Sequence, residues 1–237
     1  MLGNNWFALI ATFLISLLWL RIIDYLAHRG LISSHISRKI IHIGTGLFFI
    51  LCWILFPENN SARFFAAFVP FIITLQFFLI GIGLIKDQSS VDAMSRTGDR
   101  REILRGPLYY GIVFVLLTIF FWKDSPTGII ALVLLSVGDG LAEIIGQNFK
   151  SIYLPWSGRK TLLGSLSMFF GSTFFIIIII IIFNAIDLFQ FTLATNILKI
   201  LAITITATIV ESLTNSDIDN ITVPGIAVIL GQLLFSI

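Results

Sequence analysis

Residues 126–146 read PTGIIALVLLSVGDGLAEIIG, an apolar stretch with two carboxylates in its second half. About 20 apolar residues are enough to cross the hydrocarbon core of a bilayer as a helix. Asp139 lies well inside the stretch, where an unpaired carboxylate costs on the order of 3 kcal/mol. The stretch therefore predicts a membrane span, and Asp139 predicts either a charged partner or a functional site within it.

The apolar character of this stretch extends over the whole chain. Of the 237 residues, 57% are hydrophobic and 12% are charged, whereas soluble domains are about 25% charged. We expect an all-α fold, a multi-pass transmembrane helical bundle with seven or eight spans that forms one integral membrane domain over residues 1–237. Two of the candidate spans, 107–122 and 221–237, are marginal. The candidates are 5–23, 40–56, 62–84, 107–122, 126–146, 162–183, 192–213 and 221–237.

The basic residues predict an orientation for these spans. Twelve of the 15 Lys and Arg residues lie in or beside the loops after the first, third and fifth spans. The positive-inside rule places such loops in the cytoplasm. We expect neither a secretory signal nor an organellar transit peptide at the N-terminus, and hence a prokaryotic plasma membrane. The net charge of +2 argues against nucleic acid as the main partner.

The most specific candidate site is the Gly138-Asp139-Gly140 segment together with Glu143. Asp139 and Glu143 are one helical turn apart and share a helix face. Two carboxylates on one face can hold Mg²⁺, which prefers oxygen ligands, and Gly138 and Gly140 would let the backbone approach a ligand closely. A buried salt bridge to a neighbouring span is the structural alternative.

Basic residues begin two of the predicted spans. Arg38 and His42 share a helix face, and basic groups at a helix start, such as Arg38 and Lys39, suit an anion. Arg38 and Lys39 have the alternative role of setting topology alone. Lys160 and Thr161 follow a glycine-bearing loop and lead into the candidate span 162–183, where lysine acts as a point charge for phosphate.

Two loops add further candidates on the same side. Arg100 and Arg101 lie in the loop 86–106, and the arginine fork suits phosphate oxygens. Contact with lipid headgroups is the alternative for this pair. Glu211 and Asp219 flank the last loop; these acids either complete a metal site or are simply solvated.

Taken in order, five segments resemble the polyprenol kinase family, which includes phytol, farnesol and dolichol kinases, and are most similar to the phytol and farnesol branch. The likeness covers roughly residues 37–224. The segments are Arg38-Lys39-x-x-His42, Gly98-Asp99-Arg100-Arg101-Glu102 with Gly106-Pro107-Leu108-Tyr109-Tyr110, Gly138-Asp139-Gly140, Lys160-Thr161 with Gly164-Ser165, and Glu211-Ser212 with Asp219-Asn220.

The resemblance implies a Mg²⁺-dependent enzyme that transfers a phosphoryl group from CTP to the hydroxyl of a long-chain isoprenoid alcohol, such as phytol, farnesol or geranylgeraniol. The alcohol would come from the bilayer. The alternatives are a CTP-dependent diacylglycerol or dolichol kinase, a cytidylyltransferase acting on a lipid, and a transporter. The oligomeric state is left open.

The same resemblance implies roles for the candidate residues. Asp139, Asp219 and Glu143 are the expected metal ligands, and Glu211 is an additional candidate ligand. Nucleotide binding falls to Lys160, Thr161, Arg100, Arg101, Arg38, Lys39, Gly138 and Gly140. The general base is open between His42, Asp139 and Glu211, and Lys160 completes the catalytic set.

Overall fold

The computed structural model describes residues 3–95, 97–123, 125–188, 191–214 and 217–235, and in these ranges it contains helices and loops but no strand. The all-α prediction is confirmed. The elements are α1 (Asn5–His28), α2 (Ser34–Cys52), η1 (Trp53–Leu55), α3 (Ala62–Ile82), α4 (Gln88–Met94), η2 (Arg100–Leu104), α5 (Gly106–Phe120), α6 (Pro126–Val133), η3 (Leu134–Gly138), α7 (Asp139–Asn148), α8 (Leu162–Ala185), α9 (Leu193–Leu213) and α10 (Asp219–Phe235).

Seven helical stretches in the described ranges are long and apolar enough to cross a membrane. The marginal span 107–122 is one of them, because α5 and the preceding η2 together give an apolar stretch from Arg100 to Phe120. The other marginal span is α10, a shorter apolar helix of 17 residues. At 1.5 Å per residue it is about 25 Å long, slightly less than the ~30 Å hydrocarbon core. Residues 236 and 237 of that predicted span lie outside the described residues.

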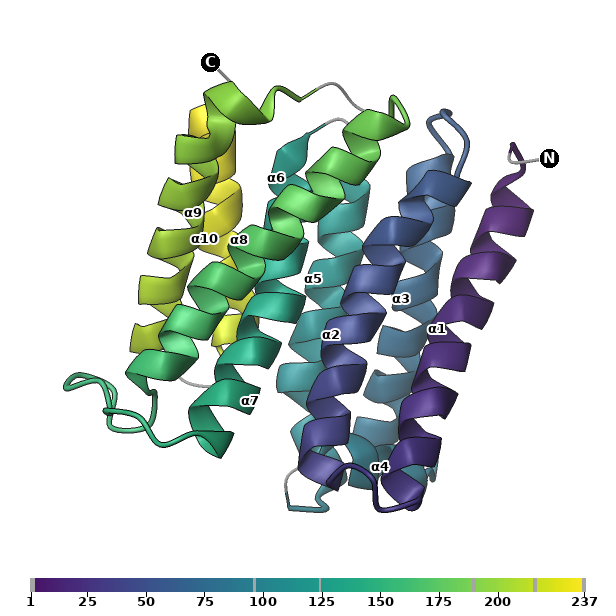
Figure 1. The fold of residues 1–237 in the computed structure, drawn as a ribbon. Coiled ribbons are helices and arrows are strands. Elements are labelled where there is room, and N and C mark those ends of the chain that lie inside the picture. The colour runs from purple at the N-terminus through teal and green to yellow at the C-terminus, as the bar shows by residue number, and fades with distance from the viewer. Residues whose placement is uncertain (1–2, 96, 124, 189–190, 215–216, 236–237) are drawn as a thin grey trace.

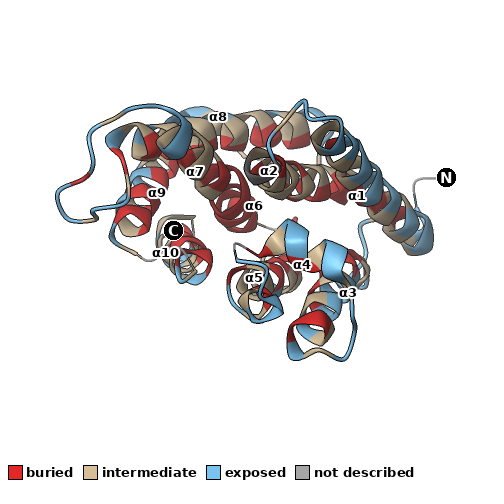
Figure 2. Ribbon diagram, turned by 90° about the horizontal axis from the view of Figure 1, so that it is seen from below, coloured by how far each residue is buried: buried red, intermediate tan, exposed pale blue. Residues whose placement is uncertain are grey.

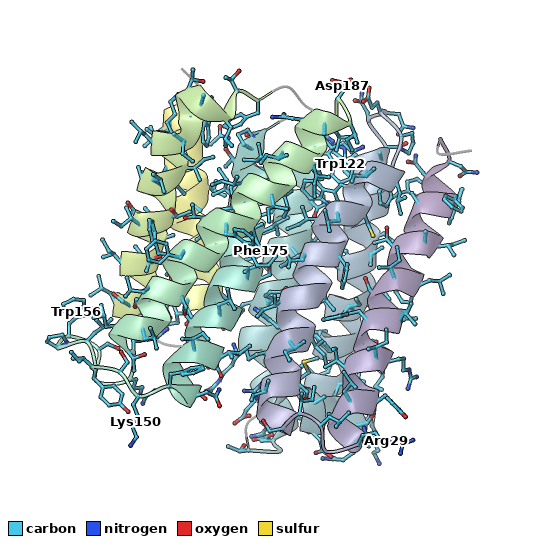
Figure 3. The ribbon with its side chains drawn as sticks, viewed as in Figure 1. Arg29, Trp122, Lys150, Trp156, Phe175 and Asp187 are labelled. Carbon is cyan, nitrogen blue, oxygen red and sulfur yellow. The ribbon has the colours of Figure 1, made fainter. Side chains whose placement is uncertain are left out.

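Successive spans run in opposite directions, so the charged loops gather at one end of the bundle (Figure 1). The loops after α1, α3, α7 and α9 lie at this end, and both chain ends lie near the other. Arg29 and Lys150 mark the charged end, and Trp122 and Asp187 mark the opposite one (Figure 3). The chain is therefore built as an integral membrane protein with its polar segments on one side.

The segment α6–η3–α7 forms the centre of the bundle. Figure 2 shows α6 enclosed by the other spans, and Ile129 to Leu135 are at most 1% exposed. Residues that are apolar on every side of a helix belong in a fully buried position. The stretch that predicts a span is thus also the core around which the other helices pack.

A π turn, η3, directly precedes Asp139 in this central segment. Close packing surrounds it: a Cβ atom on Gly138 would lie 2.6 Å from Ser172 Oγ of α8, and one on Gly140 would lie 2.3 Å from Ile43 Cγ1 of α2. Both glycines thus serve contact between helices. Neither glycine lines the cavity described below, and their predicted place beside a bound nucleotide stays a prediction.

The end opposite the charged loops contains a buried cation. Lys123 Nζ donates a hydrogen bond to the carbonyl of Phe56 at 2.7 Å and lies 5.4 Å from the ring centre of Trp122. Burial lowers the pKa of Lys123 to about 8, although the attraction of Glu58 acts in the opposite direction. This lysine therefore caps a carbonyl at the end of η1 and packs on an aromatic ring.

The packing role of Gly138 can be tested by a pair of substitutions. Gly138→Ala should lower the free energy of unfolding by about 1–3 kcal/mol, because its methyl group collides with Ser172 Oγ. Ser172→Ala removes that oxygen, which has no hydrogen-bond partner among the described residues. The double variant should recover most of the loss, and Ser172→Ala alone should be close to neutral.

Thermal unfolding of the four proteins in detergent measures this coupling as a double-mutant cycle. If Ser172→Ala did not relieve the Gly138→Ala defect, the cost would not come from this contact.

Candidate active site

A cavity of about 590 Å³ opens at the charged end of the bundle. Most of the predicted site residues line it, and they come from helices far apart in the sequence. The lining residues are Arg38 of α2; Asp92, Ala93 and Ser95 in and after α4; Asp139, Ala142, Glu143, Gly146 and Gln147 of α7; Arg159, Lys160 and Thr161 of the following loop; Gly164 and Ser165 of α8; Glu211 of α9; and Asp219 of α10.

Three carboxylates meet on one wall of this cavity. Asp139, Glu211 and Asp219 each offer an oxygen atom within 4.8 Å of the other two. Opposite ligands of a Mg²⁺ ion are about 4.2 Å apart, since each bond is about 2.1 Å long. The three acids thus lie close to the spacing of a divalent cation site.

Two of these acids carry an oxygen with no hydrogen-bond partner. Glu211 and Asp219 are each 2% exposed, and Glu211 Oε2 and Asp219 Oδ1 have no hydrogen-bond partner among the described residues. A buried polar atom without a partner is costly. These two free oxygens fit a metal ligand, and with Asp139 they form the oxygen-only donor set that Mg²⁺ prefers.

Glu211 and Asp219 both contact the ammonium group of Lys160. Its Nζ atom pairs with Glu211 Oε1 and lies 3.3 Å from Asp219 Oδ2. Burial lowers the pKa of Lys160, but the attraction of Glu211 and Asp219 outweighs it, so the pKa lies above its ordinary value. Lys160 therefore keeps its positive charge beside the two acids.

The loop 149–161 that carries Lys160 is held at two points, its last residue and its middle. Thr161 Oγ1 accepts a hydrogen bond from the Gly164 amide and caps α8. Trp156 Nε1 donates to Ser212 Oγ at 3.1 Å, beside Glu211. The loop itself reaches sideways past the lower end of α9, and Trp156 lies on its outer part (Figures 1 and 3). Thr161 thus has a capping role at the cavity edge.

A second ion-pair group joins α2 to α7. Lys39 Nζ lies 3.0 Å from Asp139 Oδ2 and 2.6 Å from Glu143 Oε2, and Arg38 Nη2 lies 3.6 Å from Glu143 Oε1. Glu143 thus faces α2 and lies outside the three-carboxylate group, whereas Glu211 belongs to it. Glu143 thus forms the salt bridge to a neighbouring span that was the structural alternative to metal binding. Lys39 is paired with both Asp139 and Glu143.

His42 faces the π turn from the next helix. Its Nε2 atom lies 3.2 Å from the Leu135 carbonyl and 3.6 Å from Asp139 Oδ2. A carbonyl only accepts hydrogen bonds, so Nε2 carries the proton in this arrangement. The Tyr110 ring packs against the imidazole with ring centres 4.2 Å apart and the ring planes tilted by 40°. His42 is therefore placed to orient Asp139, and the lining of the cavity is made by other residues.

The structure does not bring the predicted arginine pair to the cavity. Arg100 and Arg101 lie in η2 and are exposed, and the Arg100 guanidinium lies against Gly83, where α3 ends. A surface loop gives no sequence signal for the direction of its side chains. Conversely, Arg159 lines the cavity without having been predicted, although its position beside Lys160 was an available signal. Asp92 and Gln147 also line it, and no pattern marked them.

Comparison with curated proteins gives relatives over most of the chain. The "Probable phytol kinase, chloroplastic" of Triticum aestivum is 37% identical over 217 residues, which cover 91% of this chain and 72% of the relative. The "Phytol kinase 1, chloroplastic" of Arabidopsis thaliana is 34% identical over 214 residues, 90% of this chain and 70% of the relative.

The "Farnesol kinase, chloroplastic" of Arabidopsis thaliana is 36% identical over 209 residues, which cover 87% of this chain and 68% of the relative. No family model matches the chain, and no solved structure matches it. The identity and its extent, together with the membrane bundle described above, show that this chain belongs to the phytol and farnesol kinase family.

Proposed function

We propose that this protein phosphorylates the hydroxyl of an isoprenoid alcohol, with CTP as the phosphoryl donor and Mg²⁺ as the metal. The names of the relatives, phytol kinase and farnesol kinase, support the alcohol class and the reaction. The resemblance of the five sequence segments is the basis for CTP. The observation that carries the proposal is the group of three carboxylates beside Lys160, two of them buried and Asp139 partly buried, in a cavity at the charged end of the bundle.

Asp139, Glu211 and Asp219 would hold the metal, because their carboxylates are close together and Glu211 and Asp219 each carry an oxygen without a hydrogen-bond partner among the described residues. Bound there, Mg²⁺ would offset the negative charge of the phosphates, which is a main requirement of phosphoryl transfer. Glu143 belongs to the ion pairs with α2 and would keep Lys39 beside Asp139.

The chain's own residues supply the remaining requirements. Lys160 and Arg159, both in the cavity wall, would bind the phosphates. The alcohol oxygen would form a bond to the γ-phosphorus while the bond from that phosphorus to the β–γ bridging oxygen breaks and the nucleoside diphosphate leaves. The hydroxyl proton would pass to a carboxylate at the cavity, Asp139 or Glu211. His42 would orient Asp139 through its contact with Oδ2.

The placement of the cavity suits a substrate with one polar end. An isoprenoid alcohol has an apolar tail that stays among the spans or in lipid, while its hydroxyl reaches the charged end of the bundle (Figure 1). The cytoplasmic orientation stays a prediction. The expected prokaryotic plasma membrane is not supported, since the relatives are named chloroplastic.

A panel of donors and acceptors tests the reaction. Purified protein is incubated with each of four γ-labelled nucleoside triphosphates and with phytol, farnesol, geranylgeraniol or diacylglycerol. We expect label in the monophosphate of an isoprenoid alcohol, with CTP the best donor, and no label above background with Asp139→Asn. A cytidylyltransferase would transfer the nucleotide rather than the γ-label, and a transporter would transfer neither.

The metal ligands can be tested separately from the ion pair. Glu211→Gln and Asp219→Asn should each lower turnover by about 100-fold and raise the Mg²⁺ concentration needed for half-maximal rate. Asp92→Asn is the matched control: it removes the same charge from the lining of the same cavity, away from the three carboxylates and the Lys39 ion pair, and should leave that Mg²⁺ concentration unchanged. An equal shift in the Mg²⁺ requirement with Asp92→Asn would contradict the assignment.

A further inference from the structure

The ammonium group of Lys160 lies against two of the three acids that a metal ion would need. It contacts Glu211 Oε1 and lies 3.3 Å from Asp219 Oδ2, and both acids belong to the three-carboxylate group. A divalent cation on the other oxygen of each acid, Glu211 Oε2 and Asp219 Oδ1, would lie close to this ammonium and would repel it strongly. We infer that Lys160 is a placeholder: it supplies the positive charge beside these acids in the nucleotide-free enzyme and moves to the phosphates when metal and nucleotide enter together.

The structure permits this movement with a fixed backbone. The Lys160 amide donates to Ser157 Oγ at 3.1 Å, and the Lys160 carbonyl accepts from the Leu154 amide at 2.9 Å. The side chain of Lys160 is 20% exposed, whereas those of Glu211 and Asp219 are 2% exposed. The ammonium thus lies on the cavity side of the two acids. A flexible four-carbon stem lets it leave them without disturbing the loop.

Charge balance explains why the exchange would require both ligands. Asp139, Glu211 and Asp219 bring up to three negative charges together in a largely buried place, and Lys160 offsets part of that charge while no metal is bound. A divalent ion arriving alone would have to displace this lysine without offering it a new partner. A nucleotide supplies that partner through its phosphates. Metal and nucleotide should therefore raise each other's affinity, as linkage requires.

Lys39 is not a second placeholder. Its Nζ atom lies 3.0 Å from Asp139 but also 2.6 Å from Glu143, which is outside the three-carboxylate group. The Lys39 side chain is 11% exposed and belongs to α2, one of the packed spans. It retains Glu143 as a partner whether or not Asp139 binds metal. The exchange is thus assigned to Lys160 alone.

The placeholder role rests on the proposed function, because it assumes a kinase with a metal–nucleotide substrate. Its test is direct binding of Mn²⁺, a paramagnetic substitute for Mg²⁺, to the full chain in detergent, followed by electron paramagnetic resonance without nucleotide. Lys160→Met should bind Mn²⁺ at least about tenfold more tightly than the wild type, since a competing charge is gone. Lys150→Met, which removes a charge from the same loop, should bind as the wild type does.

Two further variants keep the test decisive. Lys160→Gln removes the charge but retains a hydrogen-bond donor for the acids. It should therefore show the same gain in Mn²⁺ affinity if Lys160→Met does not fold. Adding Glu211→Gln to either variant should abolish the gain, because it removes a ligand. The β,γ-methylene analogue of CTP, or of whichever nucleotide supports turnover, should raise Mn²⁺ affinity more in the wild type than in Lys160→Gln.

The outcomes separate the two proposals. If Lys160→Met and Lys160→Gln bind Mn²⁺ no more tightly than an active wild-type kinase, the placeholder role is wrong and the reaction stands. If the wild type transfers label from none of the four nucleotides to any alcohol, the proposed reaction is wrong, whatever the Mn²⁺ titration shows.

Discussion

The structure depends on balancing four carboxylates at the edge of a membrane. Asp139 is central to this balance, since it lies 3.0 Å from Lys39 Nζ and within 4.8 Å of ligand atoms of Glu211 and Asp219. A buried charge without a partner costs several kcal/mol. The helices that supply these groups, α2, α7, α9 and α10, must therefore meet at this point, together with the loop before α8. Fold and site are consequences of the same requirement.

Close helix packing makes this meeting possible. Gly140 of α7 lies against Ile43 of α2, and Ile43 is one helical turn from Lys39, on the same face. The missing side chain at Gly140 thus brings Lys39 within reach of Asp139. Gly138 plays the corresponding part toward α8 through Ser172. The π turn η3 follows the buried helix α6 and precedes Asp139, and it places the Leu135 carbonyl opposite His42.

The basic residues of this site are already paired with acids. A ligand that enters would therefore exchange partners with them and would not simply fill an empty space. Phosphoryl transfer requires positive charge near phosphate oxygens and little covalent chemistry from the protein. The required groups are present in the substrate-free enzyme, but Lys39 and Lys160 are engaged with acids. Such an arrangement keeps buried carboxylates neutralised between turnovers. In the proposed exchange it would also tie the affinity of the site for a metal to the arrival of a negatively charged partner.

The amino-acid sequence was sufficient for the spans, the place of Asp139 within one of them and the gathering of polar segments at one end. These features follow from hydropathy and charge along the chain, which act locally and need no knowledge of neighbours. The π turn and the packing roles of Gly138 and Gly140 were not predictable, because they depend on which helix lies opposite.

The choice between acids shows the same division. Helical spacing put Asp139 and Glu143 on one face, and the predicted Mg²⁺ site joined Asp219 to these two, with Glu211 as a support. Tertiary packing turned Glu143 toward Arg38 and Lys39, and it brought both Glu211 and Asp219 beside Asp139. It also left Arg100 against Gly83 and placed Arg159 at the cavity. Sequence spacing determines which residues share a helix face, whereas only the packed bundle decides what that face meets.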